Sequence, residues 1–170
     1  MATLPAPHAW VAGDYATSTF LQSLTDGINF LLVAQCAKLS QTTTQSVASG
    51  ATTTMINMTS VYDTDAMVSG SGMVVRTAGL YLVEGEVTWV ANTTGYRSAG
   101  IAVNGTDYKR VVKDTNVSGG VETSIQVTAT LRLAVNDTIN LRGIQTSGAA
   151  LGTTVTTQET TGFSAIRLST

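Results

Sequence analysis

The stretch Ala78-Gly79-Leu80-Tyr81-Leu82-Val83-Glu84-Gly85-Glu86-Val87-Thr88-Trp89-Val90 decides the fold class of this chain. It is rich in aliphatic residues that alternate with other types, as in a strand buried on one face. Alternating or Val- and Thr-rich runs, bounded by Gly, Asn, Asp and Ser, occupy 42–47, 53–58, 73–77, 80–91, 97–104, 107–113, 121–133, 136–146 and 162–168. Because no helical pattern lies among them, these runs predict an all-β chain folded as an antiparallel sandwich or barrel.

Two short sequences predict turns between these strands. Asn104-Gly105 separates two of the runs, and both central residues of a two-residue hairpin turn need positive φ, which Asn and Gly tolerate. Asn136-Asp137 is a weaker signal of the same kind, between the run ending at Val135 and the run starting at Thr138.

The composition describes a neutral surface rich in hydroxyl groups. Only 12% of the 170 residues are charged, the net charge is -2, and the apolar fraction is 43%. Low charge weakens the self-repulsion that keeps a monomer apart, so we expect part of the surface to be covered by copies of the chain or by a larger assembly. The nine basic residues are scattered singly along the sequence, which argues against nucleic acid as a partner.

The sequence predicts assembly in a cytoplasm and no insertion into a membrane. Cys36 is the one cysteine, so no intramolecular disulfide supports the fold. The chain starts without a basic segment followed by an apolar run, and it has no run of about 18 apolar residues.

The N-terminal part, residues 1–41, is predicted to be an extended arm followed by a short amphipathic helix, and residues 42–170 form the β-domain. Both prolines lie in residues 1–16. A helix over 18–32, with Ser18 as a candidate cap and Gly27 as a weak point, places one apolar face at Phe20, Leu21, Leu24, Ile28, Leu31 and Leu32. That face packs on the β-domain, pairs with its copies or inserts into another protein.

Within residues 42–170, several short sequence pieces follow one another in an order that resembles a known family. The pieces are Thr43-Thr44-Gln45-Ser46-Val47-Ala48-Ser49-Gly50, Tyr62-Asp63-Thr64-Asp65-Ala66-Met67, Ala78–Val83, Trp89, Arg97, Asn104-Gly105, Leu131–Ile139 and Phe163-Ser164-Ala165-Ile166-Arg167-Leu168. Together they resemble the C1q/TNF-like jelly roll in the diverged form found in bacteriophage virion proteins. The opening, from Leu4-Pro5-Ala6-Pro7 through Trp10-Val11-Ala12-Gly13-Asp14 to Ile28-Asn29-Phe30-Leu31, is similar to the start of minor tail and fibre proteins of phages that infect actinobacteria.

The resemblance implies a ten-stranded jelly roll of two sheets that assembles as a homotrimer, with Tyr81, Trp89 and Phe163 in the core or between protomers. Closed three-fold assembly suits a low-charge, β-branched surface. The family's aromatic content is thin here, since Phe is limited to three positions.

In function, the resemblance implies a non-enzymatic structural protein of a tailed-phage virion, a tail fibre or minor tail protein displayed for host-surface binding. The arm and helix would anchor it to other virion proteins through Trp10, Phe20, Leu21, Leu24, Ile28 and Leu31. A capsid decoration or head-fibre protein docked on the shell is the alternative, and the sequence does not separate the two. A carbohydrate-active tail-spike enzyme is a more remote one.

Candidate chemistry is sparse, and we predict no catalytic residue, metal or cofactor. His8 lies in the proline-bearing arm, away from any nucleophile. Glu84 and Glu86 share one face of a strand, which suggests a glycosidase pair, but a solvent or interface face is the preferred interpretation. Asp63 and Asp65 offer oxygen ligands for calcium, and turn formation is the preferred interpretation of both.

One candidate ligand surface surrounds the central hairpin. Aromatic and basic residues mix there: Tyr96, Arg97, Tyr108, Lys109 and Arg110, with Lys113 beside them. Such a mixture offers stacking and charge to a host saccharide or protein. Ordinary outward positions of strands are the alternative interpretation.

Overall fold

The computed structural model describes residues 17–32, 34–115, 121–156 and 160–169. The chain divides into two compact units, Met1–Ala34 and Gln35–Thr170. We call the second unit the head, and each unit is described by itself. The first unit contains the helix α1, Ser18–Leu32, with the bounds that the sequence predicts. Ser18 is already the first helical residue, and the Leu21 amide donates to the carbonyl of Thr17.

The head consists of strands, as the alternating runs predict. Their bounds are β1 Cys36–Gln41, β2 Ser46–Val47, β3 Thr53–Thr54, β4 Met58–Asp63, β5 Val68–Ser69, β6 Gly72–Val74, β7 Gly79–Trp89, β8 Tyr96–Val103, β9 Thr106–Asp114, β10 Thr123–Leu133, β11 Thr138–Gln145, β12 Leu151–Gly152 and β13 Gly162–Ser169. None of the described helices, α1 included, has both the length and the apolar character that crossing a membrane requires.

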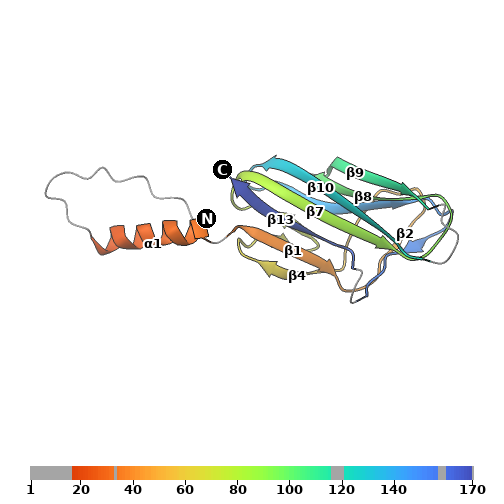
Figure 1. The fold of residues 1–170 in the computed structure, drawn as a ribbon, viewed down its shortest axis with the longest axis horizontal. Coiled ribbons are helices and arrows are strands. Elements are labelled where there is room, and N and C mark those ends of the chain that lie inside the picture. Colours follow the sequence, from red (N-terminus) through yellow and green to blue (C-terminus); the bar gives the residue numbers. More distant parts are fainter. Residues whose placement is uncertain (1–16, 33, 116–120, 157–159, 170) are drawn as a thin grey trace. The chain divides into compact units, whose positions relative to one another are not determined.

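Two antiparallel sheets face each other across the core (Figure 1). Sheet I has the strand order β10-β7-β13-β1-β4, and sheet II has the order β5-β6-β11-β8-β9, with β3 beside β11. A small third sheet pairs β12 with β2. The predicted all-β sandwich is confirmed, and ten strands lie on the two main paths, as in a jelly roll.

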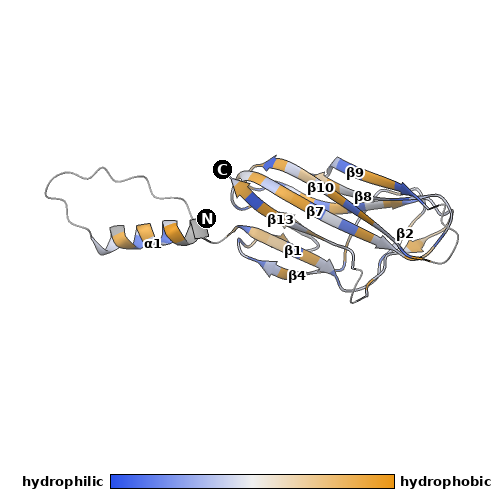
Figure 2. Ribbon diagram, viewed as in Figure 1, coloured by the Kyte–Doolittle hydropathy of each residue, from blue (hydrophilic) through white to orange (hydrophobic). Residues whose placement is uncertain are grey.

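The stretch that decides the fold class becomes β7, near the centre of sheet I. It pairs with β10 along its whole length, from Trp89 opposite Thr123 to Gly79 opposite Leu133, and with β13 on its other side. Its side chains alternate between the core and the outer face of the sheet. Figure 2 shows hydrophobic and hydrophilic bands along this strand. Glu84 and Glu86 therefore lie on the outer face, as predicted from their spacing.

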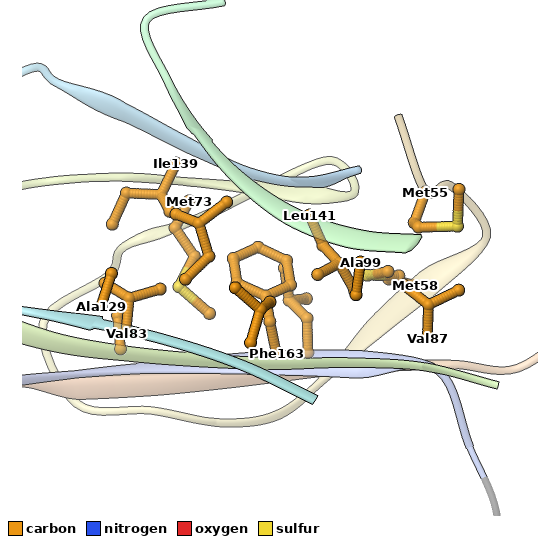
Figure 3. Packing of buried hydrophobic residues seen from close by; sticks show 14 of the residues in the cluster. Met55, Met58, Met73, Val83, Val87, Ala99, Ala129, Ile139, Leu141 and Phe163 are labelled. Atoms are coloured by element: carbon orange, nitrogen blue, oxygen red, sulfur yellow. The ribbon is translucent and has the colours of Figure 1, made fainter. Parts of the chain in front are cut away.

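Methionine fills much of the core of this chain, which has few aromatic residues. Met55 and Met67 are completely buried, and Met73 and Met58 nearly so. Figure 3 shows Met55, Met58 and Met73 among their apolar neighbours. An unbranched thioether adapts to irregular gaps between two sheets, so a chain with few Phe residues still fills its interior.

Tyr81, Trp89 and Phe163 all belong to this core. Their exposed fractions are 0%, 0% and 2%. One chain already buries them, so of the two expected places the structure gives the core. The Tyr81 hydroxyl donates to the carbonyl of Thr77 at 2.5 Å, and burial raises the pKa of Tyr81 to about 12.

The two predicted turns have different outcomes. Asn104 and Gly105 have φ of 51° and 78° and join β8 to β9, so the hairpin is confirmed. Asn136 also has positive φ, 74°. It links β10 in sheet I to β11 in sheet II, so this turn crosses the sandwich and is not a hairpin.

The head begins before residue 42, where the sequence placed its start. β1 lies between β13 and β4 in sheet I, and Ala37 and Leu39 are completely buried there. This strand has no β-branched residue, and its alternation of Ala37 and Leu39 with Lys38 and Ser40 is too short to stand out. Residues 35–41 are part of the sandwich and not of an anchor.

Candidate binding surface

The hairpin of β8 and β9 places Tyr108, Lys109 and Arg110 near its turn, and Tyr96 at its other end, opposite Asp114. β9 is the edge strand of sheet II, and all of its residues are exposed except the half-buried Val111. Tyr108 is 63% exposed, and Lys109 and Arg110 are exposed beside it, while Tyr96 on β8 is half-buried. These positions are accessible to a ligand.

Arg97 does not belong to this surface, and its assignment as a ligand residue is wrong. Its exposed fraction is 0%, because it faces the interior between Gln145 and Lys113 of the neighbouring strands. Its Nη1 donates to the carbonyls of Thr94 and Tyr96 at 3.0 and 2.9 Å. Its Nη2 donates to the carbonyl and the side-chain oxygen of Asn92 at 3.2 and 3.1 Å.

The guanidinium of Arg97 therefore holds the loop between β7 and β8. Its Nε has no hydrogen-bond partner among the described residues, and burial lowers the pKa of Arg97. A cation is tolerated at this buried position because backbone carbonyls accept from both terminal nitrogens.

Replacing Arg97 with Ala should destabilise the head by about 2–3 kcal/mol, because the carbonyls of Asn92, Thr94 and Tyr96 lose their donor and the site of a completely buried side chain is emptied. Arg110→Ala, at an exposed position, should change the free energy of unfolding by less than about 0.5 kcal/mol. Urea denaturation followed by circular dichroism measures both. Equal effects of the two substitutions would contradict the structural role of Arg97.

A cluster that the sequence analysis missed lies on the outer face of sheet II. Arg142 of β11 and Arg110 of β9 stand in one row of the sheet, on either side of Gly100. Both guanidinium groups bind the carboxylate of Asp107, Arg142 through Nη1 at 2.8 Å and Arg110 through Nη2. Nη2 of Arg142 also donates to the carbonyl of Gly105 at 2.9 Å.

We call Asp107, Arg110 and Arg142 the arginine cluster. One carboxylate faces two guanidinium groups, so the cluster keeps a net positive charge and N–H donors that its internal bonds do not use. Lys109 and Lys113 lie on the same edge strand, but they pair with Ile101 and Arg97, whose side chains face the interior, so they point away from the face that carries the cluster. Together with the exposed Tyr108, the cluster can bind a carboxylate, a phosphate or the hydroxyl groups of a saccharide.

The acidic pair lines a different feature, a shallow groove of about 500 Å³ on the outer face of sheet I. Glu84 and Glu86 share this groove with Lys38, Gln126 and Ser164. Ser124 donates a hydrogen bond to the Glu86 carboxylate. Both acids rise from the same strand and do not face each other across the groove, which is not the arrangement of carboxylates flanking a glycosidic bond.

Asp63 stabilises a turn, which is the interpretation that the sequence analysis preferred over a calcium site. Its carboxylate accepts from the backbone amides of Asp65, Met67 and Val68 at 3.3, 2.9 and 2.8 Å. These bonds hold the turn that contains Ala66, whose φ is 51°. Across the described ranges, no three His, Cys, Asp or Glu side chains gather as metal ligands would.

Of the predicted anchor residues, three are described in full. Leu21, Leu24 and Ile28 of α1 are 52%, 44% and 55% exposed. Trp10 lies outside the described residues, as do the side chains of Phe20 and Leu31.

Solved structures of TNF-family proteins share the fold of the head. The Eiger TNF of S. frugiperda matches with a TM-score of 0.63 and 11% identity, over 80% of this chain and 93% of that one. Murine APRIL at pH 5.0 matches with 0.63 and 14%, and at pH 8.0 with 0.63 and 15%, each over 80% of this chain and 100% of the other. The chain matches no protein-family model and no curated protein sequence.

The head is therefore a jelly roll of the TNF-like class. At these identities the likeness establishes the fold and leaves the activity to be argued from the residues.

Proposed function

We propose that this chain is a non-enzymatic structural protein of a tailed-phage virion, a trimeric tail fibre or minor tail protein whose head binds the host surface. The observation that carries the binding role is the arginine cluster on the outer face of sheet II, with the exposed Tyr108 on the edge strand β9. The resemblance of the opening residues to phage tail proteins supports the location in the virion. Residues 1–34 supply the attachment to other virion proteins.

The outer surface of the head supports self-association. Exposed apolar side chains gather on sheet I, where Val61, Tyr62, Ile166 and Leu168 are 57%, 44%, 37% and 53% exposed. Ile166 stands in one row of the sheet with Leu82, which is half-buried on the same outer face. An identical protomer that covers this face removes apolar area from water and closes the assembly.

The binding role is tested with the labelled full chain and actinobacterial cells. The double substitution Arg110→Gln and Arg142→Gln should lower binding about tenfold or more, because two charge-assisted contacts are lost and three heads multiply the loss. Arg132→Gln, at an exposed position of β10, is the matched control. Equal binding by the double variant and the control would contradict this site.

A further inference from the structure

We infer that α1 joins the copies of this chain to one another, as a short parallel three-helix coiled coil whose seam is Leu21, Leu24, Ile28 and Leu31. The inference rests on the trimer of the proposed function. It assigns the apolar face of α1 a partner, the same helix of the other two protomers. It goes beyond the attachment role, because the seam then faces other copies and not the virion.

The spacing along α1 is that of a heptad repeat. The four seam residues follow one another at intervals of three, four and three, which places Leu21 and Ile28 at a positions and Leu24 and Leu31 at d positions. Phe20 and Leu32 flank the seam at the g and e positions. The apolar stripe is therefore wider than a strict a/d seam, as in helices that enter a bundle.

The helix needs a partner to be stable. It has 15 residues, about the length at which an isolated helix is marginal in water, and Gly27 in its interior costs about 1 kcal/mol. Its first turn has no acidic residue and its last turn has no basic one, so its ends gain nothing from the helix dipole. Leu21, Leu24 and Ile28 are nevertheless about half exposed.

The polar face of α1 is occupied within the helix. Gln22 donates to the Asp26 carboxylate at 2.9 Å. The hydroxyls of Ser23 and Thr25 each donate at 3.0 Å to the carbonyl four residues earlier. Asp26, at the outward f position, is the one charged residue of the helix, so parallel copies meet along the seam without like charges.

Two heptads are too short to associate on their own, since coiled coils are usually sustained over three or four heptads or more. A trimer of heads lowers the length that the coiled coil needs. Leu32 lies only a few residues before β1, so the three heads hold the three helices at about millimolar effective concentration. A helix that is marginal alone then forms as its seam closes. Attachment to the virion falls to residues before Ser18.

Disulfide trapping in the full chain tests this pairing. Cys36→Ser removes the native thiol, and Leu24→Cys then places a single thiol at a d position of the seam, while Ser23→Cys places it at the neighbouring outward c position. Under mild oxidation, the Leu24→Cys chain should form a covalent dimer at least tenfold faster than the Ser23→Cys chain, because thiols at one d layer lie close enough to bridge. Light scattering of each variant gives its mass before oxidation.

The two readouts separate the coiled coil from the trimer. A trimer mass with selective Leu24→Cys cross-linking supports the inference. A trimer mass with slow or equal cross-linking at both positions overturns it and leaves the trimeric head standing. A monomer mass overturns the trimer of the proposed function and the coiled coil together.

Discussion

Removing residues 1–34 should leave a folded head, whereas removing residues 1–41 should abolish folding. The shorter deletion ends at the boundary between the two units and keeps Gln35, whose carbonyl accepts from the Arg167 amide at 2.9 Å. The longer deletion also removes β1 from the interior of sheet I, which exposes the edge of β13 and detaches β4. Domains are stable by only about 5–15 kcal/mol, less than an inner strand with its buried side chains and ladder bonds contributes.

Circular dichroism and thermal unfolding of the two truncated chains decide the matter. The chain that starts at Gln35 should show a β-type spectrum and one cooperative transition, and the chain that starts at Thr42 should show neither. A folded product from the longer deletion would mean that β1 is dispensable and that the boundary predicted from the sequence was correct.

The parts of the fold that could be predicted from the sequence are those whose pattern is local. The alternation around Tyr81 and Val83, the pair Asn104-Gly105 and the apolar spacing of residues 18–32 each fix a dihedral angle or a face without reference to distant residues. β1 was missed because its sequence, CAKLSQ, has no β-branched residue and owes its conformation to the strands on both sides.

The candidate site depends on pairings that the sequence does not display. Arg142 reaches Asp107 only because β11 and β8 pair in one register and β8 and β9 in another, across 35 positions of sequence. Arg97 and Arg110 look equivalent in the sequence, yet they point to opposite faces of sheet II. Strand parity across a two-residue hairpin would place Arg97 and Arg110 on one face. The bulge near Ala102 shifts the register so that Arg97 pairs with Lys113, three positions from Arg110, and the sequence does not display this bulge.

The burial of three glutamine side chains also could not be predicted from local sequence patterns. Gln41, Gln45 and Gln145 are at most 8% exposed. Their side-chain nitrogens donate to the carbonyls of Ile56, Thr54 and Val47 at 2.9, 3.0 and 2.8 Å. These amides satisfy backbone groups of residues 47–56, where the strands β2 and β3 are only two residues long. A polar residue type in a low-charge sequence does not signal such burial.

Substituting Trp89 with Ala should destabilise the head by about 3–5 kcal/mol, the cost of emptying a large aromatic site inside a packed core. Trp89 is completely buried at the end of β7, and its backbone bridges to Thr153. The ring also limits its neighbours, because a Cβ placed on Gly143 would approach the Trp89 Cζ2 within 2.7 Å. The side chain thus fills space between the two sheets. Its removal lowers the stability of the single protomer, whether or not protomers associate.

The measurement for Trp89→Ala is the denaturation midpoint by circular dichroism, with the mass by light scattering at low denaturant. Tyr108→Ala is the control, because a side chain 63% exposed on an edge strand should change the free energy of unfolding by less than about 0.5 kcal/mol. A Trp89→Ala chain of unchanged stability but monomeric mass would place Trp89 between protomers. A lowered midpoint with the native mass still present below the transition would assign it to the core of a single chain, where its complete burial puts it.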